Sequence, residues 1–246
     1  MPKDKTHLII GLGEVGRALH TVFEQENLQV VGRDLAGEIA EKHDVLHVCF
    51  PCKEPAIFAH QVLEYAAKYL KDGGLVIVHA TVPVGTVGIM GTSAVHSPIR
   101  GVHPNLAGGI RTFVKYFGGP RATEAAAIFE AIGVQTRVTG DSRNTEALKL
   151  WDTTQYGLNI VLEKAMHAYC AAHGLDFDLI YGDANKTYNA GYATLGMGHV
   201  ARPVLKHVDG KIGGHCVVPN ARLLGDWIGD LITGFDDGLP NVHTQK

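Results

Sequence analysis

One glycine-rich hexapeptide near the start of the chain constrains the fold more than any other feature. Gly11-Leu12-Gly13-Glu14-Val15-Gly16 follows the apolar run 7–10 and opens a stretch of helical periodicity over 14–26. In a turn between a strand and a helix, the first glycine permits the tight bend and the second lets a ligand approach the backbone. The third lets the helix pack closely on the strand. The hexapeptide therefore predicts the first β–α unit of a doubly wound sheet.

The following segments repeat this alternation. Strands are predicted at 28–31, 45–50, 75–79, 94–96, 114–117 and 135–138, and helices at 55–70 and 122–132. Apolar strands between amphipathic helices are typical of a parallel sheet covered on both faces. The expected fold class is α/β, with a Rossmann-type doubly wound parallel sheet over residues 1–140.

A long helix is predicted after this sheet. Residues 143–173 contain no Pro and a single Gly, Gly157, and Gly174 follows as a C-terminal cap. A short helix over 176–188, a glycine-rich stretch over 189–220 and a helix near 221–232 complete a mostly helical domain, 141–246. The long helix has more apolar surface than the short tail covers, so a homodimer through residues 143–173 is expected.

An acid at the end of the second predicted strand indicates which ligand the hexapeptide binds. Asp34 lies 23 positions after Gly11, near the ~20 expected for the acid that binds the adenosine ribose of a dinucleotide. An acid there repels a 2′-phosphate, so NAD is favoured over NADP. Arg33 moderates this preference, because it can stack on adenine or bind a 2′-phosphate. The predicted cofactor-binding residues are Gly11, Leu12, Gly13, Glu14, Val15, Gly16, Arg33, Asp34, Phe50, Pro51 and Thr81.

Composition excludes several other classes of protein. The 246 residues are 46% apolar and 19% charged, which is typical of a globular chain rather than a disordered one. The net charge of −3 and the lack of a basic tract argue against nucleic acid as a partner. The apolar runs are far shorter than the ~20 residues that span a bilayer. The four cysteines form no disulfide framework, and with no signal-peptide pattern the expected location is the cytoplasm.

Three further segments resemble the UDP-glucose/GDP-mannose dehydrogenase family. His79-Ala80-Thr81-Val82-Pro83-Val84-Gly85-Thr86 is similar to that family's S-T-V-P-x-G-T. Glu146-Ala147-Leu148-Lys149-Leu150 is similar to its E-x-x-K-L-x-x-N. Gly213-Gly214-His215-Cys216-Val217-Val218-Pro219-Asn220 is similar to its G-G-H-C-x-P-x-D. The segments occur in the family's order, and the resemblance runs from about residue 7 to 220.

The resemblance implies roles for three residues. Cys216 would capture an aldehyde as a thiohemiacetal, which a second hydride transfer converts to a thioester and water hydrolyses to an acid. Lys149 would stabilise or deprotonate the alcohol, and Thr81 would hold a catalytic water near the nicotinamide. From the sequence, Cys216 is either a thiolate nucleophile or an ordinary buried thiol. Lys149 is either a catalytic lysine or a solvated lysine on the helix surface.

Several positions depart from the family pattern. Thr153 stands where the family has Asn, and Asn220 stands where it has Asp. The family's glutamate is absent, and His103 is the candidate replacement acid or base. The chain ends 30 residues after Cys216, at Lys246, so the family's second nucleotide-binding domain is expected to be missing, which makes a nucleotide-sugar substrate doubtful.

Three functions remain open. The first is oxidation of an alcohol on a small polar, anionic or sugar-like substrate, extending to the carboxylate. The second is a two-electron dehydrogenase of the 3-hydroxyacid or 6-phosphogluconate type, and the third is a non-catalytic NAD-binding protein. A cluster over 202–211, with Arg202, Lys206, His207 and Lys211, either neutralises an anionic substrate or forms a solvated loop. The scattered histidines and Cys49-x-x-Cys52 indicate no metal site.

Overall fold

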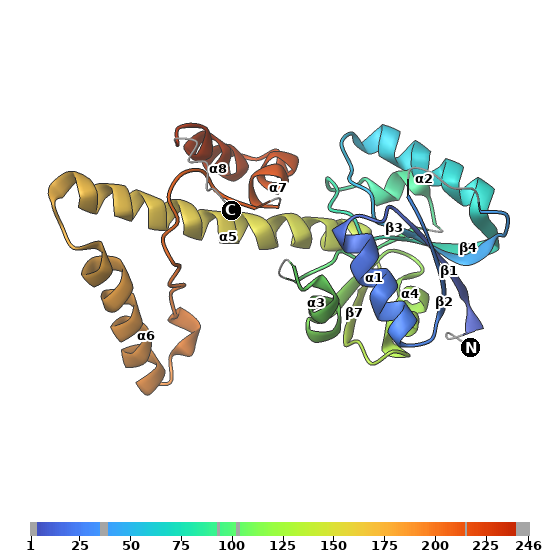
Figure 1. The fold of residues 1–246 in the computed structure, drawn as a ribbon, viewed down its shortest axis with the longest axis horizontal. Helices are drawn as coiled ribbons and strands as arrows, with labels where there is room; N and C mark the ends of the chain where they lie inside the picture. The colour runs from blue at the N-terminus through green and yellow to red at the C-terminus, as the bar shows by residue number, and fades with distance from the viewer. Residues whose placement is uncertain (1–3, 35–38, 93, 102–103, 215, 240–246) are drawn as a thin grey trace. The chain divides into compact units, whose positions relative to one another are not determined.

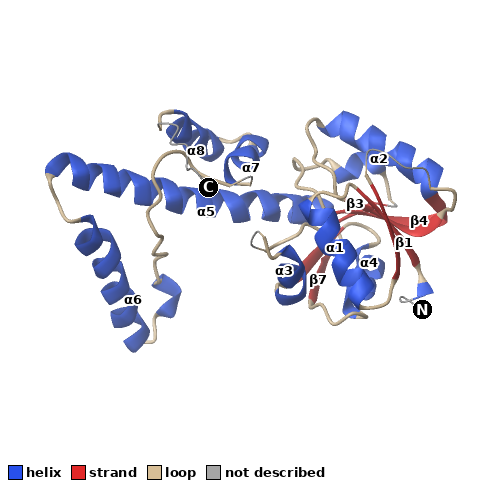
Figure 2. Ribbon diagram, viewed as in Figure 1, coloured by secondary structure: helices blue, strands red, loops and turns tan. Residues whose placement is uncertain are grey.

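The computed structural model describes residues 4–34, 39–92, 94–101, 104–214 and 216–239. Seven strands form a sheet in the order β2-β1-β3-β4-β5-β6-β7, shown in red in Figure 2. They are β1 (Thr6–Ile10), β2 (Gln29–Arg33), β3 (His43–Val48), β4 (Leu70–Val78), β5 (Ala94–His96), β6 (Lys115–Gly118) and β7 (Thr136–Thr139). All seven predicted strands are confirmed to within a few residues, except that β4 begins five residues earlier than expected.

The sheet is parallel except at one pair of strands. β1 to β5 pair in parallel, β5 pairs with β6 in antiparallel fashion through His96 and Gly118, and β7 runs parallel to β6. In its described residues, the connection from β5 to β6 contains one short helix, α3 (Leu106–Thr112), which returns the chain without a full crossover. The expected α/β doubly wound architecture is confirmed.

Helices cover both faces of this sheet (Figure 1). α1 (Glu14–Gln25), α3 and α4 (Ala122–Glu130) pack on one face, and α2 (Pro55–Tyr69) packs on the other. Phe23 and Phe129 are fully buried on the first face, and Phe58 is buried on the second. Burying each such side chain contributes roughly 1.5–3 kcal/mol to stability. Because successive residues of a strand point to opposite faces of the sheet, the central strands contribute side chains to both apolar layers.

The long helix α5 (Ser142–His173) confirms the prediction over 143–173 to within one residue. Gly174 ends it with a φ of +65°, the left-handed conformation that favours glycine. The helices that follow are α6 (Ala184–Thr194), α7 (Val217–Leu224) and α8 (Trp227–Asp237). A π-helical turn at Asp178–Asp183 precedes α6. The predicted helix near 221–232 is two helices, and the first of them, α7, begins at Val217 inside the predicted glycine-rich stretch, with Cys216 at its N-cap position.

The chain divides into two compact units, residues 1–150 and residues 151–246. The first unit contains the sheet. In the second unit, α7 and α8 pack on each other and on α5 through an apolar cluster that includes Ile212, Val217 and Ile232. Among the described residues, none of the helices combines the length and apolarity needed to cross a membrane.

Candidate functional site

The hexapeptide forms the turn between β1 and α1 that its sequence predicts. Gly11 has a φ of +91°, and a Cβ there would lie 2.9 Å from the backbone nitrogen of Phe50. A Cβ on Gly16 would lie 1.9 Å from the Gly11 carbonyl oxygen, so the helix packs against the turn at a distance that only glycine permits. A Cβ on Gly13 would meet nothing within 4 Å. Gly13 therefore faces open space at the N-terminus of α1.

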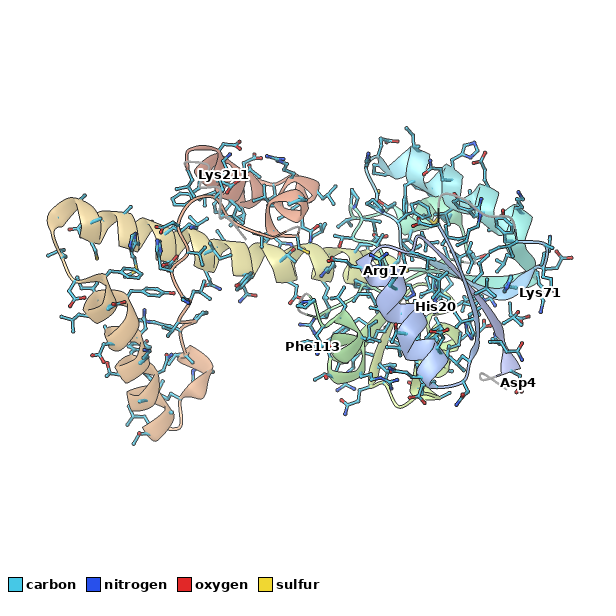
Figure 3. The ribbon with its side chains drawn as sticks, viewed as in Figure 1. Asp4, Arg17, His20, Lys71, Phe113 and Lys211 are labelled. Carbon is cyan, nitrogen blue, oxygen red and sulfur yellow. The ribbon has the colours of Figure 1, made fainter. Side chains whose placement is uncertain are left out.

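This open space suits a phosphate-bearing ligand. Gly13 is the N-cap of α1 and makes no side-chain cap bond to that helix. The amides at the start of a helix and the helix dipole favour an anion at this position. Leu12, Glu14 and Val15 lie in the same turn, and Figure 3 labels Arg17 one turn further along α1. The residues present thus fit the diphosphate of a dinucleotide.

The end of β2 lies next to this turn, because the Gly11 N–H donates to the Arg33 carbonyl at 2.8 Å. Asp34 follows directly and is exposed. The Arg33 guanidinium lies 5.4 and 5.2 Å from the ring centroids of Tyr65 and Tyr69 on α2. The carboxylate at this edge therefore remains available to a ribose, while the arginine stacks on aromatic side chains.

The end of β3 supplies the other wall of the turn. Phe50 packs on Phe58 with ring centroids 5.0 Å apart, and Pro51 is exposed. Burial raises the pKa of the Cys49 thiol to about 12 and that of the Cys52 thiol to about 11. Thiols with such pKa values are protonated at neutral pH, and a protonated thiol is a poor nucleophile. No group of three or more potential metal ligands occurs in the described part of the chain.

The loop after β4, which carries Thr81, is held by a buried carboxylate on α5. Glu146 is fully buried and accepts hydrogen bonds from the N–H groups of Gly85 at 2.6 Å and Val87 at 2.8 Å. Burial raises the pKa of Glu146, and the two donors oppose that rise. The sequence marked Glu146 as part of a motif but gave it no role. The structure shows that it fixes the Thr81 loop to the helix that bears Lys149.

A buried histidine completes this region of the first unit. Burial lowers the pKa of His96 to about 3. The hydrogen bond to Ala80 raises this pKa, and the Lys115 and Lys149 ammonium groups lower it further. A neutral ring has one N–H, and the Ala80 carbonyl, 3.1 Å from Nε2, can only accept. Nδ1 of His96 lies 2.9 Å from the Thr145 hydroxyl, which also lies 2.9 Å from the Ser142 carbonyl oxygen. Ala80, Thr145 and Lys149 are thus neighbours of one neutral ring.

The second unit contains the cysteine loop. Cys216 is partly exposed and occupies the N-cap position of α7. The Asn220 side chain donates from Nδ2 to the Thr153 hydroxyl at 3.2 Å. A Cβ on Gly157 would lie 2.7 Å from Val217, so this glycine lets α7 approach α5. The two positions that depart from the family pattern, Thr153 and Asn220, therefore bond to each other and join the two helices.

A cavity of about 320 Å³ lies beside this loop in the second unit. Three lysines line it, and Figure 3 labels one of them, Lys211. Lys164 donates to the backbone carbonyls of Val208 and Gly210. The His207 ring bonds to the buried Glu163 carboxylate at 2.7 Å. The full lining is Tyr156, Ile160, Glu163, Lys164, Leu205, Lys206, Val208, Lys211 and Gly213.

The predicted site residues therefore form two groups. The first unit gathers the glycine turn, Asp34, Thr81 and Lys149, and the second gathers Cys216, Asn220 and Thr153. His103, the proposed acid or base, lies outside the described residues.

The chain is similar in fold to several solved structures. A UDP-N-acetyl-mannosamine dehydrogenase from Staphylococcus aureus matches with a TM-score of 0.68 and 19% identity, over 93% of this chain and 67% of that one. A 3-hydroxyisobutyrate dehydrogenase from Mycobacterium tuberculosis matches with a TM-score of 0.65 and 16% identity, over 94% and 92%. A UDP-glucose dehydrogenase from the archaeon Pyrobaculum islandicum matches with a TM-score of 0.68 and 15% identity, over 95% and 68%.

Comparison with protein-family models and with curated proteins finds no match. At the identities of the solved structures, the likeness establishes the Rossmann-type fold.

Proposed function

We propose that this protein is an NAD-dependent oxidoreductase that acts on an alcohol. The observation that carries the proposal is the β1–α1 turn, where Gly13 faces open space between two glycines that cannot carry a side chain. The exposed Asp34 at the end of β2 favours NAD over NADP, because a carboxylate repels a 2′-phosphate. The solved dehydrogenases of the same fold support this interpretation. NAD, when bound, supplies the hydride acceptor.

Residues of the first unit then act on the substrate. Lys149 holds the alcohol oxygen and receives its proton or stabilises its negative charge. Thr81 orients a water molecule, and Glu146 positions the Thr81 loop through its two backbone hydrogen bonds. Glu146 is a positioning residue, since both its carboxylate oxygens are used inside the protein.

Cys216 extends the proposal to a four-electron oxidation. Its sulfur would attack the aldehyde carbon to give a thiohemiacetal, and a second bound NAD would supply the two-electron oxidation of that adduct to a thioester. Water then attacks the thioester carbon, releasing the carboxylic acid and restoring the thiol. The resemblance around 213–220 and the partial exposure of Cys216 support this step.

The second candidate function is a two-electron oxidation, of the 3-hydroxyacid or 6-phosphogluconate type. One observation favours it: Asn220, an amide that cannot act as a base, bonds to Thr153 at 3.2 Å and so joins two helices. The two candidates differ in the number of NADH molecules formed per substrate, with two expected for the four-electron path and one for the two-electron path.

Substitution of Cys216 distinguishes the two routes independently. Under the covalent route, Cys216→Ser abolishes NADH formation from both alcohol and aldehyde, while the fold and NAD binding persist. Unchanged activity would refute the covalent route. Tight NAD binding with no turnover on a broad alcohol panel would favour a non-catalytic NAD-binding protein.

The lysine-lined cavity of 320 Å³ supports an anionic substrate. Lys206 and Lys211 come from the segment in which the sequence places a cationic cluster. The informative experiment is thermal stabilisation by nucleotide sugars, sugar phosphates and hydroxy acids in the presence of NAD. Stabilisation confined to uncharged alcohols would refute an anionic substrate.

We also propose that a second copy of this chain covers α5. Large apolar side chains on this helix are exposed, including Trp151, Tyr156, Leu162 and Tyr169, of which Leu162 and Tyr169 are each 58% exposed. Trp151, Leu162 and Tyr169 are separated by 11 and 7 residues, close to whole turns of the helix, so they share one exposed face, and an exposed apolar face marks an interface. A dimer in sedimentation at micromolar concentration is expected, and a monomer would contradict the proposal.

A further inference from the structure

Three buried histidine rings form a continuous hydrogen-bonded chain through the sheet of the first unit. Nδ1 of His7 lies 3.0 Å from Nε2 of His47, and Nδ1 of His47 lies 2.9 Å from Nε2 of His79. The rings come from β1, β3 and the end of β4. The proposed oxidoreductase chemistry uses none of them.

The strand register explains why the rings meet. His47 pairs with Ile9, two residues beyond His7, and Ile77 pairs with His47, two residues before His79. Each histidine thus lies one step diagonally from the next on the same face of the sheet, within reach of a long side chain. The chain of rings runs from the amino end of β1 toward the carboxyl end of β4.

The fourth member of this chain is Lys115, at the start of β6. Its ammonium nitrogen lies 3.3 Å from Nδ1 of His79 and 3.0 Å from the carbonyl oxygen of Ser97. The same carbonyl lies 2.8 Å from Nδ1 of His79. Lys115 is 4% exposed, and its ammonium lies 5.0 Å from the centroid of the Phe129 ring. At this distance, the charge of Lys115 affects which ring nitrogen of His79 carries the proton.

Burial keeps all three rings neutral. It lowers the pKa of His7 to about 4 and places the pKa values of His47 and His79 well below the usual range. Burial also lowers the pKa of Lys115 to about 7, with Cys49 opposing and Lys149 adding to the effect. The other titratable groups that act on the chain are Lys5, His43 and Asp44 near His7, and His96 near His79. The covering helices α1 and α4 present the apolar rings of Phe23 and Phe129.

We propose that His7, His47, His79 and Lys115 form a proton relay across the sheet, in which the charge of Lys115 sets the tautomer of every ring. When Lys115 is charged, it donates to Nδ1 of His79, and each ring carries its proton on Nε2. When Lys115 is neutral, His79 donates from Nδ1 to Ser97, and each ring carries its proton on Nδ1. The hydrogen bonds between rings persist in both states with donor and acceptor exchanged.

The relay step conserves every proton. Lys115 gives one proton to Nδ1 of His79, whose Nε2 proton passes to Nδ1 of His47. The Nε2 proton of His47 passes to Nδ1 of His7, and the Nε2 proton of His7 is the one that the chain as a whole gives up to solvent. Nε2 of His7 is buried and has no hydrogen-bond partner among the described residues, so this last transfer takes place when the amino end of the sheet opens locally to water.

Nitrogen NMR of the full chain tests the relay without cofactor or substrate. The ¹⁵N shifts of Nδ1 and Nε2 distinguish the two neutral tautomers from imidazolium, for which free histidine gives reference values. We expect the three rings to change together from the Nε2–H to the Nδ1–H tautomer as the pH rises through about 7. One tautomer at every pH, or separate midpoints for the three rings, would overturn the proposal.

Two variants separate the relay from ordinary burial. In Lys115→Met the rings are expected to keep the Nδ1–H tautomer at every pH, because only Ser97 then faces His79. In His47→Phe an aromatic ring remains but carries no proton, so His79 continues to change tautomer with pH and His7 stops. A tautomer change of His79 in Lys115→Met, or of His7 in His47→Phe, would refute the relay.

Discussion

Lys115 makes the stability of the first unit depend on pH in a direction that can be calculated. Its pKa falls from 10.5 to about 7 on folding. The unfolded chain binds this proton more tightly than the folded chain does. The free energy of unfolding is therefore highest above the unfolded pKa of 10.5, and it decreases as the pH falls toward the folded pKa of about 7. From about pH 9 to about pH 6, this loss is about 3 kcal/mol at about 1.4 kcal/mol per tenfold change in proton affinity.

Lys115→Met removes this dependence while preserving an unbranched apolar stem. Relative to the variant, the natural chain is expected to gain about 3 kcal/mol of unfolding free energy between about pH 6 and about pH 9. Lys68→Met, on the exposed face of α2, is the matched control for loss of a surface charge and is expected to show no such change.

Urea denaturation followed by circular dichroism measures these free energies. Both tryptophans, Trp151 and Trp227, lie in residues 151–246, so tryptophan fluorescence reports on the second unit. Hydrogen exchange of the strand amides assigns the transition to the sheet. Parallel pH profiles for the natural chain and Lys115→Met would refute a buried lysine with a lowered pKa.

The remaining predictions concern the glycine turn, the Thr81 loop and the histidines. Gly16→Ala is expected to destabilise the protein by roughly 2–3 kcal/mol through overpacking, because its Cβ would lie 1.9 Å from the Gly11 carbonyl oxygen; an unchanged melting temperature would contradict this. Glu146→Gln offers one acceptor where the carboxylate binds two N–H groups, so a loss of about 2–4 kcal/mol in urea denaturation is expected; a loss below about 0.5 kcal/mol would show that the loop has another anchor. Folding lowers the pKa of His7 from 6.5 to about 4. As the pH falls from about 6.5 to about 4.5, the free energy of unfolding is therefore expected to decrease by about 2 kcal/mol more in the natural chain than in His7→Phe. Equal decreases in the two proteins would disprove the lowered pKa of His7.

The sheet could be predicted because its signals are local. The central predicted strands, such as 45–50 and 75–79, are mostly apolar runs, and the hexapeptide 11–16 carries its own structural requirement in Gly11 and Gly16. The long helix could be predicted for the same reason, since 143–173 lacks breakers and Gly174 ends it. Local preference and tertiary packing agree in these segments, so periodicity alone located them.

The elements that were missed depend on contacts distant in sequence. α3 has two glycines in seven residues and low helix propensity, and it forms where Asn105 caps it and Ile110 packs into the core. α7 begins inside a glycine-rich loop, where Val217 packs at Gly157 and Asn220 bonds to Thr153. Gly157 and Thr153 lie on α5, outside any short window of sequence around α7.

The same limit applied to the candidate site. The residue types of the glycine turn, Asp34, Thr81 and Lys149 follow motif spacing. The role of Glu146 depends on two amides about 60 positions away. The histidine chain needs the register of three strands, so no spacing in the sequence reveals it.

Calorimetry of NAD binding to Gly13→Val decides whether the β1–α1 turn holds the dinucleotide. The natural chain and Gly140→Val are measured alongside. A Cβ on either glycine would meet nothing within 4 Å, so both variants are expected to fold. Only at Gly13 would the new side chain occupy the place of the diphosphate. The natural chain and Gly140→Val are expected to bind NAD equally, and Gly13→Val is expected to lose at least about tenfold in affinity, or about 1.4 kcal/mol. No binding of NAD to the natural chain, or equal binding to Gly13→Val, would contradict it.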